Sequence, residues 1–163
     1  MIFAIKEAFW SWGKDFAIND DKGKPVYRIV GKAFSWNNKL SFQDVRGNEL
    51  AKINQKLLSL RPRYEIFIDD QKFAEVIKEW SWLKQKFTLD IPGPNDYTIT
   101  GSFWQHEFTF EQQGKVVANV SKKMFDWSDS YSVDIVDGED IVAILCTCIV
   151  IDQVLHDDSS NTA

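Results

Sequence analysis

Apolar residues recur at every second position in short runs along most of this chain. Tyr27 and Ile29 share one side of such a run, and Leu40 and Phe42 share one side of the next. The breaks between runs are rich in Asn, Asp, Gly and Pro, which favour tight turns. This pattern predicts about twelve short antiparallel strands with no long helix between them. Such strands must bury one face, and either a β-sandwich or a closed barrel would do so.

The strand pattern is repeated within the chain. The motif Ile-Lys-Glu followed by Trp-Ser-Trp starts at Ile5 and returns at Ile77. Further pairs match in the same order along the chain, among them Phe42 with Phe110, Ala51 with Ala118, and Tyr64 with Tyr131. Collinear matches of this kind predict an internal duplication. We expect two copies of about six strands each, at about 2–71 and 72–138.

The last segment of the chain has a different pattern. The acidic stretch 137–140 suits the start of a helix, where carboxylates meet free backbone N–H groups. The run 141–151 has no polar side, so a helix at about 139–155 must be enclosed on every side. It is too short to span a bilayer core of about 30 Å. Its β-branched residues leave a thirteenth buried strand as the alternative.

A twelve-stranded barrel has room inside for a helix about 10–12 Å across. The fold class that the sequence predicts is therefore mainly β. We expect a closed twelve-stranded antiparallel barrel, built from two six-strand repeats, that encloses a hydrophobic C-terminal helix.

Composition and charge limit the remaining possibilities. The chain has 163 residues, of which 44% are hydrophobic, and this suits one globular domain. We expect that domain at 1–157, with a disordered tail at 158–163. The net charge of −5 disfavours a nucleic-acid partner. The N-terminal residues show no secretory leader, and Cys146 and Cys148 are poor disulfide partners, so we expect a cytoplasmic protein.

Several short sequence segments resemble the LURP-one-related family. They occur in order at 39–44, 47–51, 55–59, 64–66, 115–118, 120–123, 137–140 and 151–157. The resemblance covers nearly the whole chain and is greatest to small stand-alone bacterial members. The family fold is similar to the tubby C-terminal domain and to phospholipid scramblases, which implies a twelve-stranded barrel around a hydrophobic C-terminal helix. The stand-alone members supply no settled activity, so function is carried over only from distant relatives.

Catalytic chemistry has little support in the sequence. His106 lies at an expected strand turn and His156 near an expected helix C-terminus, where both have structural explanations. Cys146 and Cys148 would face nearly opposite sides of a helix and cannot share a metal ion. The Gly-rich phosphate-binding motifs are missing from the sequence. We therefore expect no enzyme, with no catalytic residue, no metal ligand and no cofactor.

An acidic cluster before the final segment raises the hypothesis of a calcium site, as in scramblase-like relatives. Its members are Asp126, Asp129, Asp134, Asp137, Glu139 and Asp140. Their spacing does not match an EF-hand loop. Turn formation and helix capping are the competing explanation for the same residues.

Charge is distributed unevenly along the chain. Residues 22–86 carry 14 Lys and Arg against 7 Asp and Glu, which leaves 5 against 17 elsewhere. The candidate lipid-binding residues in this basic stretch are Lys52, Lys56, Arg61, Arg63, Lys78, Lys84 and Lys86. Trp80, Trp82 and Leu83 lie among them, and this combination suits an anionic lipid surface. Ordinary strand alternation, with Lys outward and aromatic residues inward, is the competing explanation.

Two functions from different classes follow from this pattern. The first is a non-catalytic, tubby-like domain that binds anionic phospholipid or a membrane surface and is peripheral at the membrane. The alternative is a soluble cytoplasmic interaction or scaffold protein with a protein partner and no lipid ligand. Lipid carriage inside the barrel is a third, weaker possibility, because the terminal helix would occupy that space.

Overall fold

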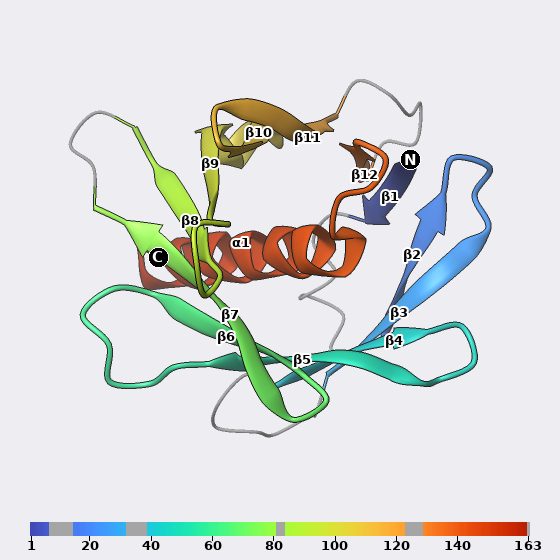
Figure 1. Ribbon diagram of the computed structural model, residues 1–163, viewed down its shortest axis with the longest axis horizontal. Coiled ribbons are helices and arrows are strands. Elements are labelled where there is room, and N and C mark those ends of the chain that lie inside the picture. The colour runs from blue at the N-terminus through green and yellow to red at the C-terminus, as the bar shows by residue number, and fades with distance from the viewer. Residues whose placement is uncertain (7–14, 32–38, 81–83, 123–128, 163) are drawn as a thin grey trace.

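A computed structural model shows twelve antiparallel strands that surround a single long helix (Figure 1). It describes residues 1–6, 15–31, 39–80, 84–122 and 129–162. The first six strands are β1 (Ile2–Lys6), β2 (Phe16–Asp20), β3 (Pro25–Gly31), β4 (Leu40–Asp44), β5 (Glu49–Gln55) and β6 (Arg63–Ile68). The next six are β7 (Gln71–Glu79), β8 (Lys86–Asp90), β9 (Tyr97–Ser102), β10 (Glu107–Gln112), β11 (Lys115–Ser121) and β12 (Ser130–Ile135).

Each strand pairs with its neighbours in sequence, and β1 pairs with β12 to close the barrel. In that closing pair, Phe3 lies opposite Val133. The alternating pattern explains the geometry, since Leu40 and Phe42 point inward and are buried while Ser41 between them is less buried. The predicted closed antiparallel barrel is therefore confirmed, and the sandwich is not formed.

The two halves of the barrel share a backbone irregularity. The β4–β5 register shifts just after Phe42, which lies opposite Ala51. The β10–β11 register shifts just after Phe110, which lies opposite Ala118. Such bulges bend a strand and increase its twist. Their occurrence at matched positions, with six strands in each half, agrees with the internal duplication read from the sequence.

Helix α1 (Ile141–Asn161) runs through the middle of the barrel (Figure 1). The carboxylate of Asp140 caps its N-terminus by accepting a hydrogen bond from the backbone N–H of Ala143. Every residue from Ala143 to Leu155 is buried. The run therefore forms the enclosed helix and not a thirteenth strand, because only a helix satisfies its own backbone groups away from the sheet.

The end of α1 corrects the sequence interpretation. A helix end near 155 and a disordered tail from 158 were expected, but the helix continues to Asn161. The added turns are polar, and they are held by the barrel wall at Tyr64 and Lys78. A polar sequence predicts disorder only when nothing contacts it, and here the wall supplies the contacts.

Connections between strands alternate between the two ends of the barrel. We call one end the turn end, where α1 begins and the connections are 21–24, 45–48, 69–70, 91–96, 113–114 and 136–140. We call the other the loop end, where α1 finishes. Its described connections are the β5–β6 loop (56–62), residues 80 and 84–85 between β7 and β8, and η2 (Phe103–Gln105) with its flanking residues. In Figure 1 the loop end lies at the left.

Candidate functional site

The predicted basic residues lie on one part of the barrel wall. The four strands β5, β6, β7 and β8 are consecutive neighbours in the barrel. Four of the seven residues lie on these strands, Lys56 and Arg61 lie in the loop between β5 and β6, and Lys84 lies between β7 and β8. The fold therefore brings together Lys52, Lys56, Arg61, Arg63, Lys78, Lys84 and Lys86.

Most of these cations are paired with carboxylates. Glu75 on β7 is the centre of one cluster, in which its oxygens lie 3.2, 3.5 and 3.8 Å from the charged nitrogens of Lys72, Arg63 and Lys56. Burial opposes ionisation of Glu75, but the hydrogen bond from Lys72 and the charges of Lys56 and Arg63 outweigh it and lower the pKa of Glu75.

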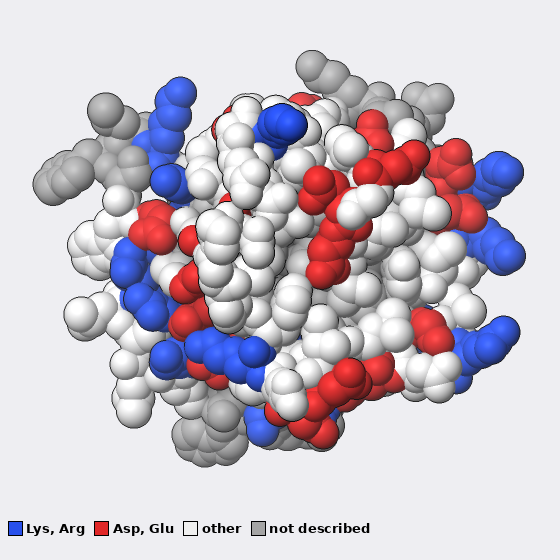
Figure 2. All heavy atoms as spheres, viewed as in Figure 1, with Lys and Arg blue, Asp and Glu red and all other residues white. Residues whose placement is uncertain are grey.

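The remaining pairs extend this pattern to both ends of the wall. Lys52 pairs with Asp70 at the turn end. Arg61 pairs with Glu79, and Lys78 pairs with Asp158 of α1, at the loop end. In Figure 2, basic and acidic atoms accordingly lie side by side over β5, β6 and β7 and form no single basic area. The surface predicted to be cationic is thus largely neutralised.

An exposed apolar group at the loop end was not predicted as a site. In the β5–β6 loop, Leu58 is 106% exposed and Leu60 is 98% exposed, and Leu57 is about half exposed. Trp80 at the end of β7 is 79% exposed, so it does not follow the inward alternation that the competing explanation required. Trp82 and Leu83 lie outside the described residues. A signal was present in the sequence, since three leucines in four residues are unusual in a connection between strands.

Polar contacts within the β5–β6 loop and at its ends support its conformation. The backbone N–H of Lys56 donates to the carbonyl of Arg63 at 2.9 Å. The Ser59 hydroxyl lies 2.6 Å from the carbonyl of Arg61 and 3.2 Å from that of Lys56. Leu58 has a φ of 63°, which a residue with a Cβ adopts only at a cost of about 1–2 kcal/mol. The loop therefore presents its most exposed leucine in a strained conformation, a feature that occurs often at functional sites.

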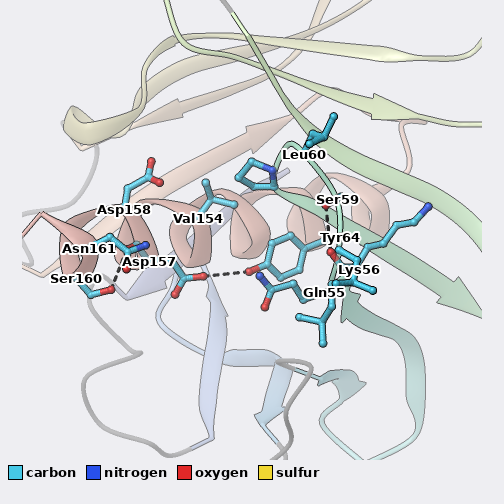
Figure 3. A pocket seen from close by; sticks show the side chains of 13 residues that line it. Gln55, Lys56, Ser59, Leu60, Tyr64, Val154, Asp157, Asp158, Ser160 and Asn161 are labelled. Atoms are coloured by element: carbon cyan, nitrogen blue, oxygen red, sulfur yellow. Dashed lines mark hydrogen bonds between the residues drawn. The ribbon is translucent and has the colours of Figure 1, made fainter.

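A pocket of about 410 Å³ lies between this loop and the last turns of α1 (Figure 3). Leu57, Leu58 and Leu60 line it on the loop side. Val154 and Asp157 line it on the helix side, and Figure 3 shows Asp157 directed at the hydroxyl of Tyr64. A second hollow, lined by Trp80, shares Leu60, Pro62 and Asp158 with the first. The β5–β6 loop therefore borders two hollows at the loop end.

His106 has a structural partner, as the sequence suggested. Its Nε2 lies 3.0 Å from Oδ1 of Asp152, and its ring stacks on Tyr131 at 4.4 Å. The Tyr131 hydroxyl donates to the other oxygen of Asp152 at 2.6 Å. These contacts tie the buried carboxylate of α1 to the wall and leave it enclosed. The geometry suits anchoring of the helix to the barrel wall.

The two cysteines are enclosed in the middle of α1. Cys146 and Cys148 are fully buried and make no disulfide. Burial raises the pKa of both thiols well above the usual value. Because a thiol reacts as its thiolate, burial and the raised pKa disfavour reaction of these two groups in the folded chain.

The acidic cluster at the turn end is used in turns and caps. Asp140 caps α1, and the N-terminal amine lies 3.9 and 3.7 Å from Asp134 and Asp137. Burial, with a hydrogen bond to Glu139, raises the pKa of Tyr97 to about 12. Asp126 lies outside the described residues. Within the part of the chain that the structure describes, no three His, Cys, Asp or Glu side chains are grouped to hold a metal ion.

Barrel, helix and loops together define a class of protein: a closed twelve-stranded barrel filled by its own C-terminal helix. The family model for LURP-one-related proteins matches residues 1–152, and the chain belongs to this family. The resemblance read from the sequence is thereby confirmed.

One curated protein and one solved structure are similar to this chain. The chain is 35% identical over 158 residues to the uncharacterized protein YxjI of Bacillus subtilis, with 97% of this chain and 96% of that protein covered. A solved structure of a protein from Arabidopsis thaliana has a TM-score of 0.67 at 15% identity, over 95% of this chain and 90% of that one. At that identity the similarity shows the fold alone. No helix within the described ranges is long and apolar enough to cross a membrane.

Proposed function

We propose that this barrel is a non-catalytic domain that attaches to anionic membrane surfaces through its loop end, on the cytoplasmic side. The observation that carries the proposal is the braced β5–β6 loop, which holds Leu58 and Leu60 almost wholly in water. Exposed apolar side chains on a rigid loop gain free energy when they leave water. Trp80 supports the same contact, because Trp is favoured at the boundary between head groups and acyl chains.

The apolar contact is strong enough for reversible attachment. Moving one leucine side chain out of water contributes about 1.5–3 kcal/mol, so Leu58 and Leu60 together contribute about 3–6 kcal/mol. A single myristoyl chain binds membranes with an association constant of about 10⁴ M⁻¹, which is about 5 kcal/mol. Stable attachment therefore needs a second contribution, and attraction to anionic lipid supplies about 1 kcal/mol for each cation near the surface.

The ion pairs decide which cations can make this second contribution. Arg61 and Lys78 keep carboxylate partners at the loop end, so their attraction to lipid is partly cancelled. Lys86 makes no ion pair with another described residue. We therefore expect the leucines to dominate binding and the cations to modulate it, with a shallow dependence on salt.

Co-sedimentation with lipid vesicles tests the proposal. We expect the wild-type protein to sediment with vesicles that contain phosphatidylglycerol and to bind pure phosphatidylcholine vesicles less. The double variant Leu58→Glu, Leu60→Glu should bind at least about tenfold more weakly, which corresponds to about 1.4 kcal/mol. Val45→Glu is the matched control, because Val45 is also exposed but lies at the turn end.

Two outcomes of the vesicle experiment would contradict the proposal. If Lys84→Glu, Lys86→Glu weakens binding more than the leucine variant, the contact is mainly electrostatic and the carrying observation is wrong. If the wild-type protein stays in the supernatant with anionic vesicles at low salt, membrane attachment is contradicted. The alternative, a soluble interaction protein with a protein partner, would then be favoured.

A further inference from the structure

The pocket between the β5–β6 loop and α1 has an apolar rim, here called the lip, and a polar base, here called the floor. The side chains of Leu57, Leu58 and Leu60 form the lip. The floor is made by the end of α1, where Asp157 and Asn161 lie one turn apart on the same side of the helix. With about 410 Å³ of space, the pocket can hold a small polar group whose apolar continuation leaves past the leucines.

Asp157 differs from the other two aspartates of α1. Asp152 faces His106, and Asp158 pairs with Lys78. Asp157 accepts a hydrogen bond from Gln153 at 2.9 Å and a long one from the Tyr64 hydroxyl at 3.4 Å. Among the described residues it has no cationic partner within ion-pair distance. Asp157 thus brings to the pocket a carboxylate without a cationic partner, unlike Asp158. Lys56 also lines the pocket, but its ammonium group pairs with Glu65 and Glu75.

The helix adds to this negative potential. The pocket lies at the C-terminus of α1, where the helix dipole places a partial negative charge and the last carbonyls lack helical partners. No basic residue lies in the last turn to offset it. The hydroxyl of Ser160 is turned back onto the carbonyl of Asp157 at 2.8 Å. The floor therefore favours a cation that donates hydrogen bonds.

From this charge and shape we infer that the pocket binds a primary ammonium group, supplied by the ethanolamine head group of a phospholipid. The inference rests on the proposed membrane attachment, which brings the pocket to head-group depth. A primary ammonium has three N–H donors, which match the Asp157 carboxylate, the Ser160 hydroxyl oxygen and the Asn161 amide oxygen that line the pocket. A choline head group has no N–H to donate, so it fits this floor less well.

Vesicle binding with matched charge provides the test. Two vesicle sets contain the same fraction of phosphatidylglycerol, and the remainder is phosphatidylethanolamine in one and phosphatidylcholine in the other. We expect the wild-type protein to bind the ethanolamine vesicles at least about threefold more tightly, which is about 0.65 kcal/mol. Asp157→Asn should lose this preference and bind the choline vesicles as the wild-type protein does. Asp21→Asn, an exposed change at the turn end, is the control.

A second variant guards against a loss of structure. Asn161→Arg places a guanidinium four residues from Asp157, where it can pair with that carboxylate and occupy the pocket. It should abolish the preference while its circular dichroism stays native. Calorimetric titration with free phosphoethanolamine, compared with phosphocholine, separates a lipid source from a soluble one.

The outcomes distinguish the inference from the proposed function. Equal binding of both vesicle sets, with no heat from phosphoethanolamine, overturns the ammonium pocket and leaves membrane attachment standing. Heat from phosphoethanolamine that Asp157→Asn removes, in a protein that binds no vesicle, supports the pocket with a soluble amine and contradicts membrane attachment. A preference for ethanolamine that survives Asp157→Asn also overturns the pocket, because lipid packing would then explain it.

Discussion

The two ends of this barrel are built from the same strands but differ in their connections. At the turn end, connections are short and several rely on positive φ angles at glycine, as at Gly47, Gly114 and Gly138. At the loop end, the described connection 56–62 is longer and carries exposed leucines. Tight turns hold strand register and leave little surface for recognition. Longer loops on a rigid barrel are where binding residues are usually found.

Helix α1 shows the same contrast along its length. Its first turn has a carboxylate cap from Asp140 and then enters an apolar interior. Its last turns carry Asp152, Asp157 and Asp158, and two of these contact cationic or imidazole groups of the wall. The start of the helix is thus organised for stability, and its end also shapes a pocket. Similar substitutions at the two ends should therefore differ in their effect on the free energy of unfolding.

The largest difference is expected between two glycines. An alanine Cβ at Gly101 would lie 2.5 Å from the carbonyl oxygen of Glu107 and 2.6 Å from the Cα of Phe108. Gly101→Ala should therefore lower the free energy of unfolding by about 3 kcal/mol or more, since backbone atoms must move. Gly114→Ala, with φ of 76° and open space, should cost only about 1 kcal/mol. Urea titrations measure both, and equal losses would contradict the close strand approach at Gly101.

A smaller difference is expected between two aspartates of the helix region. Asp152→Ala leaves the buried Tyr131 hydroxyl and His106 without their partner, which should cost about 2–4 kcal/mol. Asp140→Ala removes one N-cap and should cost about 1 kcal/mol. Thermal unfolding at constant pH compares them. A larger loss for Asp140→Ala would show that the cap, and not the polar anchor, dominates the seating of α1.

The smallest effect on stability is expected at Leu58. Unlike the substitutions above, this one should stabilise the protein. Asn tolerates positive φ better than Leu, so Leu58→Asn should raise the free energy of unfolding by about 0.5–1 kcal/mol. The same change should weaken vesicle binding, because it removes an exposed apolar side chain. Unfolding and co-sedimentation of the one variant measure both effects. Gain of stability with unchanged binding would contradict a role for this leucine in membrane contact.

The architecture could be predicted because it depends on patterns along the chain. Alternation, turn residues and the doubled motif predicted twelve strands in two copies, and the run 141–151 predicted an enclosed helix. The extent of α1 was missed, because its polar last turns are stabilised by Tyr64 and Lys78 on distant strands. Such contacts leave no periodic signal in the sequence.

The candidate site was predicted less well for a related reason. The seven candidate cations lie on or beside β5 to β8, because neighbours in sequence are neighbours in the barrel, and their role in lipid binding stays a prediction. Their neutralisation by Glu75 and Glu79 depends on which residues face each other across strands, and a shift of one residue would change every partner. The exposure of Leu58 was missed because apolar residues are expected to be buried.

Pairing of β1 with β12 has a consequence for how the protein is made. The closing contact joins Phe3 to Val133, so β1 can make this pairing only after β12 has left the ribosome. The helix that fills the barrel is synthesised after β12, and until then the inner faces of all twelve strands lack the apolar residues that cover them in the folded protein. Contacts so distant in sequence slow folding and expose apolar surface to aggregation. A chain of this topology is therefore a natural client for chaperones during translation.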